Sequence, residues 1–407
     1  MKLPASRQFL SALLLASGLF LAAGCSKDKN IDPPAELTKF ESAARIQKVW
    51  GADAGNGEPK MRLGLSHAVY GQLVFAADHK GNVSAFSLEN GKRLWRTDTD
   101  LPLTAGPGAG EGLVVVGASH GDMVALDAKT GAVRWKTRIN SELLSAPVIV
   151  PQAVVFRAVD GRVVALSPAD GKQIWSAEQQ VPRLSLRGTA RPAATGEMVV
   201  SGFDNGRVLA MSITDGATLW EALVSPPTGR TELERLIDID SAVHIVGDDV
   251  YAVTYQGRIA RLARDSGQSW WSRDLSSYRG LTTDEDGVYV STSEGAVIKI
   301  GRRTGVELWR NEVLSRRRLS APAVTGNFVL VGDYDGYVHV LDATTGELVA
   351  REHIAGERMS ADPVVQDGLV IFLSADGDLV ALRVEARGGT TKAKDAAAEP
   401  RDAAAQE

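Results

Sequence analysis

Six histidines and fifty acidic residues are the side chains of this sequence best suited to metal binding or acid–base catalysis. No two histidines have the spacing at which zinc-binding pairs occur. The sequence also has no Gly-x-Ser-x-Gly turn for a nucleophilic serine and no glycine-rich phosphate loop. We therefore expect no catalytic residue, no metal and no cofactor. The histidines are His67, His79, His120, His244, His339 and His353.

Cys25 is the only cysteine of the chain. The basic residues Lys2 and Arg7 and the apolar stretch 9–23 before it are typical of a signal peptide. Residues 21–24, Leu-Ala-Ala-Gly, resemble the lipobox of bacterial lipoproteins, although the leucine stands four residues before the cysteine and not three. We expect a signal peptide over 1–24 and a lipid on Cys25, whose acyl chains would contribute roughly 0.8 kcal/mol per buried methylene to membrane binding. A plain secretory signal with an unmodified cysteine is the alternative.

The chain ends and the overall charge bear on location and partners. Ser26 follows the cysteine, and by resemblance to lipoprotein sorting rules it favours the outer membrane, with the protein facing the periplasm. Residues 25–44 are polar and carry two prolines, which predicts a flexible tether. Residues 387–407 have no apolar periodicity and predict a disordered tail. The net charge of −5 and a pI near 5.8 argue against nucleic acid as a partner.

One pattern, two glycines ten residues apart, recurs between these ends in seven complete copies. In six of them a tryptophan follows four residues later, and in the seventh Ala350 stands in its place. The copies are spaced by 40, 40, 45, 51, 38, 41 and 41 residues, and a period near 40 with glycine turns and one aromatic residue is typical of a propeller blade. The first glycines are Gly81, Gly121, Gly161, Gly206, Gly257, Gly295 and Gly336, and Gly377 begins an incomplete eighth copy.

Each copy divides into four short strands, which in the third copy we expect at 146–150, 153–158, 162–167 and 172–177. The eighth copy has three strands only, and residues 46–50 match a fourth strand. We therefore predict an all-β, eight-bladed propeller of four-stranded antiparallel blades over 45–386. An N-terminal strand completes the last blade, which leaves no open sheet edge. We expect each tryptophan to pack against the neighbouring blade, where such a ring buries about 150–250 Å².

Two spacings are longer than the rest, and both excesses fall between the fourth strand of one blade and the first strand of the next. Because the two connections belong to successive blades, we expect them to emerge side by side on one face. The first carries Leu184, Leu186 and Arg187, and the second carries Asp238 and Asp240. Apolar residues and an arginine beside complementary acids are the composition of a protein-binding hot spot.

A second interpretation of these residues needs no partner. The leucines would cover the end of a blade, and Arg187 would pair with Asp238 or Asp240 within the chain. Both interpretations hold together if an internal pair shapes the loops that a partner contacts. Arg183 and residues 316–318 lie on the same type of connection, and for these we expect only a solvated charged rim.

The combination resembles the BamB family, the propeller lipoproteins of the outer-membrane β-barrel assembly (BAM) machinery, and covers the lipobox, the tether, all eight blades and the two long connections. The resemblance implies a non-catalytic scaffold that binds the periplasmic POTRA domains of BamA and other BAM complex subunits, and that contacts unfolded outer-membrane protein substrates. In that family a serine-leucine-arginine segment and an Asp-x-Asp segment dock on BamA. Leu184, Leu186 and Arg187 match the first segment, and Asp238 and Asp240 match the second.

The blade pattern also resembles that of pyrroloquinoline quinone dehydrogenases. Those enzymes carry two adjacent cysteines at the cofactor, calcium ligands and large inserted loops, whereas the propeller region here has no cysteine and mostly short connections. The blade pattern therefore indicates the fold and not a dehydrogenase activity. A reduced quinoprotein dehydrogenase remains one alternative. A ligand-sensing propeller for sugar or peptidoglycan fragments is another, and it would need aromatic residues at the mouth of the channel.

Overall fold

The computed structural model describes residues 33–55, 64–180, 182, 190–228, 230–231, 237–359 and 361–387. The predicted signal peptide (1–24), Cys25 and all of the predicted tail except residue 387 lie outside these ranges. Within them, no helix is both long and apolar enough to cross a membrane.

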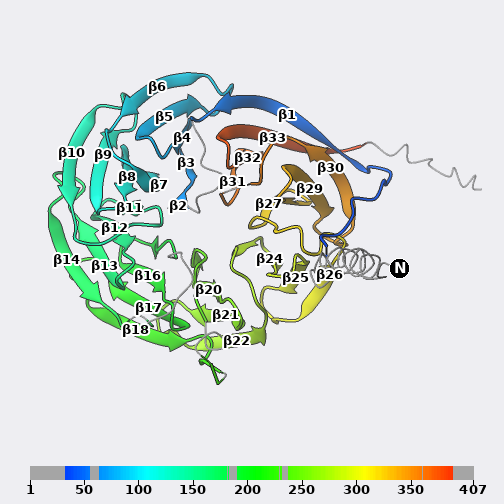
Figure 1. Ribbon diagram of the computed structural model, residues 1–407. Coiled ribbons are helices and arrows are strands. Elements are labelled where there is room, and N and C mark those ends of the chain that lie inside the picture. Colours follow the sequence, from blue (N-terminus) through cyan, green and yellow to red (C-terminus); the bar gives the residue numbers. More distant parts are fainter. Residues whose placement is uncertain are drawn as a thin grey trace, which may run out of the picture.

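Short runs of valine, alanine and leucine, separated by glycine turns, form antiparallel sheets that are arranged as a ring (Figure 1). The third copy forms β11 (Val148–Val150), β12 (Ala153–Arg157), β13 (Arg162–Leu166) and β14 (Gln173–Glu178), each within two residues of the expected bounds. Within the four strands of each blade, the first lies nearest the axis and the fourth is outermost. The eight sheets of the described residues confirm the predicted propeller.

The blades are numbered in chain order from the sheet that follows β1. Blades 1 and 2 contain β3 (His67–Tyr70), β4 (Leu73–Ala77), β5 (Asn82–Ser87) and β6 (Arg93–Asp98), then β7 (Leu103–Gly110), β8 (Leu113–Ala118), β9 (Asp122–Asp127) and β10 (Val133–Arg138). Blades 4 and 5 contain β15 (Ala193–Ala194), β16 (Met198–Gly202), β17 (Arg207–Ser212) and β18 (Thr218–Leu223), then β19 (His244–Val246), β20 (Asp249–Val253), β21 (Arg258–Ala263) and β22 (Ser269–Asp274). Blades 6 and 7 contain β23 (Leu281–Thr283), β24 (Gly287–Ser291), β25 (Val297–Gly301) and β26 (Glu307–Asn311), then β27 (Ala323–Thr325), β28 (Phe328–Gly332), β29 (Tyr337–Asp342) and β30 (Leu348–His353).

The eighth blade is assembled from both ends of the propeller. It contains β31 (Val364–Gln366), β32 (Leu369–Leu373) and β33 (Asp378–Ala386), and its outermost strand is β1 (Ala44–Asp53). β1 pairs antiparallel with β33 from Ala44↔Ala386 to Asp53↔Asp378. The predicted closure of the ring by an N-terminal strand is therefore confirmed. One strand was not expected: β2 (Gly64–Leu65) adds a short parallel partner to β7.

The repeated tryptophan and glycine form one contact between neighbouring blades, here called the tryptophan–glycine staple. In blade 3 the indole Nε1 of Trp175 donates a hydrogen bond to the carbonyl oxygen of Ile213 at 2.8 Å. Gly216 of blade 4 lies against the ring, and a Cβ there would be 2.6 Å from Cε3 of Trp175. The φ of +74° at Gly216 also favours glycine. The expected packing of the tryptophans is confirmed. The other staples are Trp50–Gly91, Trp95–Gly131, Trp135–Gly171, Trp220–Gly267, Trp271–Gly305 and Trp309–Gly346.

No staple joins blades 7 and 8, because Ala350 replaces the tryptophan on β30. The N-terminal segment 33–43 lies along blade 7 instead. The guanidinium of Arg351, on β30, donates to the carbonyl oxygen of Thr38 at 2.8 Å and lies 5.3 Å from the ring centre of Phe40. Leu37 packs against the hydrophobic cluster between blades 6 and 7. This part of the predicted tether is thus in contact with the ring.

Candidate functional site: the axial cavity and the connections around it

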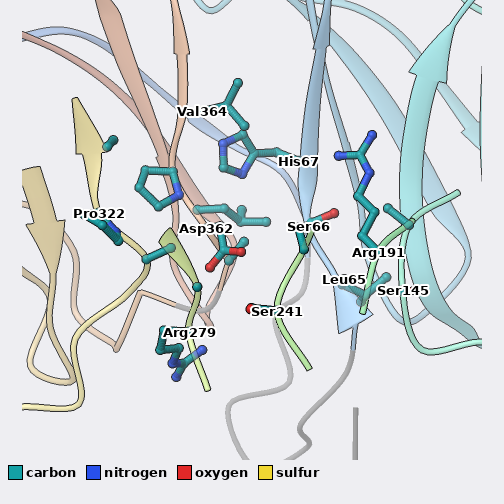
Figure 2. Close-up of a pocket in the computed structure, with 18 of the residues that line it drawn as sticks. Leu65, Ser66, His67, Ser145, Arg191, Ser241, Arg279, Pro322, Asp362 and Val364 are labelled. Carbon is teal, nitrogen blue, oxygen red and sulfur yellow. The ribbon is translucent and has the colours of Figure 1, made fainter. Parts of the chain in front are cut away.

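Described residues from most of the connections between an outermost strand and the next innermost strand lie at the ring axis. Together they line a cavity of about 1070 Å³, to which the connection between β6 and β7 does not contribute. Figure 2 shows side chains from several blades around this space, among them His67, Ser145, Arg191 and Asp362. The two long connections, between β14 and β15 and between β18 and β19, belong to this set.

The predicted docking residues fall into two groups. Leu184, Leu186 and Arg187 lie outside the described residues, so their role stays a prediction. Asp238 is fully buried, and its carbonyl oxygen accepts a hydrogen bond from the backbone N–H of Tyr255 at 2.9 Å. Asp240 lines the axial cavity. The acidic segment is therefore packed down onto blades 4 and 5.

Two isoleucines hold the acidic segment in place. Ile237 forms a parallel bridge with Asn205, and Ile239 is buried where a Cβ at Gly202 would collide with it. Ile239 also belongs to the hydrophobic cluster between blades 4 and 5. Since apolar and acidic residues alternate, burying the isoleucines fixes the direction of both aspartates.

A buried ion pair beside Asp240 was missed by the sequence analysis. Arg157, the last residue of β12, is fully buried, pairs with Asp204 and lies 5.0 Å from the ring centre of Phe203. In five other blades the position of Arg157 is Gly, Ala or Ser, and in two it is Val or Leu. A charge at a position that is otherwise small or apolar is the signal that could have found it. Its partner Asp204 lies in the turn between β16 and β17.

We expect Asp240→Asn to stabilise the chain at neutral pH. Burial, and after it the negative charge of Asp204, raises the pKa of Asp240 from 3.8 to about 6, while Arg157 opposes the shift. Between these two values the folded chain binds a proton that the unfolded chain does not, so stability falls as the pH rises through this window. Asparagine does not ionise, so the variant does not lose this stability as the pH rises. The expected gain at pH above about 7 is about 1–2 kcal/mol, because partial solvent exposure reduces the full effect of a two-unit shift.

Urea denaturation of wild type and Asp240→Asn, at about pH 7.5 and about pH 3.5, measures this gain. The difference should be present at the higher pH and vanish at the lower one. A difference of the same size at both values would show that the substitution acts through packing and not through charge.

The expectation of a solvated rim at residues 316–318 is wrong for Arg317. This residue is 3% exposed and forms ion pairs with Asp333 at 2.7 Å and Asp335 at 3.0 Å. It also donates to the carbonyl oxygen of Ala35 at 3.0 Å. The acids come from the β28–β29 turn and the carbonyl from the N-terminal segment, so neither partner is near Arg317 in the sequence.

Comparison with known proteins identifies the family. The family model described as "Outer membrane protein assembly factor BamB" matches residues 3–99, 79–311 and 293–392. The BamB of Pseudomonas aeruginosa is 41% identical over 377 residues, which cover 93% of this chain and 99% of that protein. The chain belongs to the BamB family. It is an outer membrane protein assembly factor, and so a non-catalytic protein.

Solved structures agree with this BamB assignment. The crystal structure of BamB from Moraxella catarrhalis has a TM-score of 0.76 at 30% identity and covers 83% of this chain and all of that chain. The quinohemoprotein alcohol dehydrogenase of Comamonas testosteroni has a TM-score of 0.65 at 13% identity over 83% of this chain and 76% of that one. At such low identity the second likeness shows the fold alone.

The residues around the axial cavity do not fit a quinone cofactor with its calcium ion. No described group of three or more acidic, histidine or cysteine side chains is arranged to hold a metal. The only cysteine, Cys25, precedes the propeller, so the adjacent cysteines of the quinoprotein dehydrogenases have no counterpart here. The likeness of this BamB-family chain to those enzymes is therefore one of fold.

Proposed function

We propose that this chain is a lipid-anchored scaffold of the outer-membrane β-barrel assembly machinery that binds the periplasmic POTRA domains of BamA. The observation that carries the proposal is the BamB family match, which extends over nearly the whole chain. A closed ring of eight blades, with staples at seven of its eight junctions, suits a scaffold, because it offers a partner a broad face that changes little on binding.

The proposed docking surface is the pair of long connections that precede blades 4 and 5. Leu184, Leu186 and Arg187 provide the apolar and cationic contacts. Asp240 provides an acidic group at the same end of the ring. Asp238, being buried, acts through the shape of the connection and does not touch the partner. Packing of the second connection supports this role, since a preorganised loop loses less entropy when a partner binds.

The anchor proposal concerns Cys25, which carries the lipid and holds the ring at the periplasmic side of the outer membrane. Pro33 stands eight positions after Cys25, and its carbonyl oxygen accepts a hydrogen bond from Arg316 at 3.0 Å. Even fully extended, this stretch spans at most about 28 Å. Contacts of the segment 33–43 with blade 7 therefore keep that side of the ring close to the bilayer.

A reconstitution tests the function and the anchor together. BAM machinery that lacks this subunit is placed in liposomes, and the rate at which an unfolded β-barrel protein becomes folded is measured. Addition of the lipidated chain should raise the rate several-fold. The Cys25→Ser variant, which cannot carry the lipid, should need roughly tenfold more protein for the same effect, since it is not concentrated at the membrane. An insertion rate that the lipidated chain leaves unchanged would exclude the assembly role.

A further inference from the structure

One position in each blade lies near the axial end of the first strand, just before the strand begins or, in blade 2, within it. In blade 3 it is Ala146, two residues before Val148, and strand pairing links Val148 through Val155 and Ala165 to Trp175. The same pairing in every blade defines an equivalent residue, here called the axial position. In blade order the axial residues are Ser66, Gly106, Ala146, Arg191, Ala242, Gly280, Ala321 and Asp362.

Six of the eight axial residues are serine, glycine or alanine, and all but Gly106 line the cavity. The small side chains leave open the space around the axis. The two exceptions are a cation, Arg191, and an anion, Asp362. They belong to blades 4 and 8, which lie on opposite sides of an eight-bladed ring. Figure 2 shows both side chains beside the cavity.

No ion pair within the described part of the chain neutralises either of these charges. Neither Arg191 nor Asp362 forms an ion pair with a described residue, and Asp362 is exposed to the cavity. Although Asp362 keeps accessible surface toward the cavity, the protein packed around both groups reduces their hydration. This desolvation lowers the pKa of Arg191 and raises the pKa of Asp362. The positive charge of Arg279, a hydrogen bond from the backbone N–H of Ala321 and then the positive charge of Arg191 act against this shift at Asp362 and favour its ionised form. Two opposite charges thus face one cavity, whose lining also includes Arg279, Arg318 and Arg358.

In the chain order of the blades, a pair of tyrosines lies between Arg191 of blade 4 and Asp362 of blade 8. Tyr255 and Tyr278 pack edge to face with ring centres 6.3 Å apart, and both line the cavity. The guanidinium of Arg279 lies 5.4 Å from the ring centre of Tyr278. Such rings accept apolar side chains. These are the aromatic residues that a ligand-binding propeller requires at its channel.

Buried polar groups with no partner among the described residues complete the lining. They are the hydroxyls of Ser145 and Ser241 and the Nδ1 atom of His67, whose side chains are 7%, 4% and 3% exposed. All three residues border the cavity (Figure 2). A buried polar atom that lacks a partner costs about 1–3 kcal/mol. These three atoms are covered by the protein, so they make the wall of the cavity more polar without touching a ligand.

We propose that the axial cavity binds a small zwitterionic molecule, a short peptide with an apolar side chain. Its carboxylate pairs with Arg191 and its ammonium group with Asp362, while the apolar side chain packs on Tyr255 and Tyr278. Such a ligand satisfies both separated charges at once, which a simple anion or a neutral sugar cannot do. The site adjoins the proposed docking surface, because Asp240 belongs to both, but ligand binding in the cavity does not require a partner.

The test is calorimetric titration of the full chain in detergent with the dipeptide Ala-Phe, its N-acetyl form and its C-terminal amide. Ala-Phe should bind with a dissociation constant below about 1 mM, and each capped form at least tenfold more weakly, about 1.4 kcal/mol. In Arg191→Gln the C-terminal amide should bind as well as free Ala-Phe, because the variant lacks the cation that pairs with the carboxylate. In Asp362→Asn the N-acetyl form should bind as well as free Ala-Phe, because the variant lacks the anion that pairs with the ammonium group.

Matched controls are Arg207→Gln and Asp367→Asn, which remove exposed charges from the same two blades away from the cavity. Both should keep the wild-type preference for the uncapped dipeptide. Thermal midpoints of all four variants show whether the ring is folded. No binding of Ala-Phe to wild type at about 10 mM, equal binding of the capped forms to wild type, or an unchanged preference in folded Arg191→Gln and Asp362→Asn would each overturn the proposal.

Discussion

A chain that begins at Ala54 is expected not to form a stable ring. This truncation removes β1, which supplies nine paired positions along β33 and the outermost strand of blade 8. It also removes Trp50, 6% exposed, whose indole donates to Leu88 and packs on Gly91 of blade 1. Loss of a buried tryptophan alone costs about 3–5 kcal/mol, and Ile46 is buried as well, so the total approaches the 5–15 kcal/mol that stabilises a typical domain.

A chain that begins at Pro33 is the matched control, because it lacks residues 1–32 and keeps every described contact. Circular dichroism and size-exclusion chromatography should show a folded monomer for the control, and aggregated or unfolded protein for the shorter chain. The shorter chain should also expose the edge of β33, which favours association with other chains. Equal thermal midpoints for the two chains would contradict closure of the ring by β1.

We expect Trp271→Ala to destabilise the ring by about 3–4 kcal/mol. The indole of Trp271 donates to the carbonyl oxygen of Arg302 at 3.0 Å and lies 6.3 Å from the ring of Tyr251, measured between ring centres. A Cβ at Gly305 would be 2.8 Å from the indole Cδ2. Alanine therefore removes a filled contact between blades 5 and 6 and leaves a cavity beside Gly305.

Trp270, the preceding residue on β22, provides a close control. Its side chain is 55% exposed and is not part of a staple, so Trp270→Ala should change the free energy of unfolding by no more than about 0.5 kcal/mol. Urea denaturation monitored by far-ultraviolet circular dichroism gives both values. Similar losses for the two variants would mean that the staple does not hold the blades together.

The propeller was predictable from the sequence because its strongest signals are local. The glycines of the staple need a positive φ and the room that a missing Cβ leaves, so glycine and tryptophan recur at fixed distances within each copy. Closure by β1 followed from the same count, since the eighth copy lacks a fourth strand. Both inferences use positions in or beside the third and fourth strands of a blade. The spacing across the connection between these two strands does not vary among the complete copies.

The residues at the axis were not predictable in this way. Arg191 and Asp362 follow connections of different lengths, so counting from the repeat glycines does not bring them into register. Strand pairing is what shows that they occupy one position in opposite blades. Burial of Asp238 likewise depends on packing of Ile237 and Ile239 against blade 4, a tertiary contact that composition does not report.

A binding titration tests the central claim most directly. The chain from residue 26, without its lipid, is titrated against the soluble POTRA domains of BamA from the same organism, together with Arg187→Ala, Asp240→Ala and the control Asp367→Asn. Wild type and the control should bind with micromolar or tighter affinity, and the two docking variants, shown to be folded by circular dichroism, at least tenfold more weakly, about 1.4 kcal/mol. Absence of binding by the folded wild-type chain would contradict the proposal that it is a scaffold for BamA.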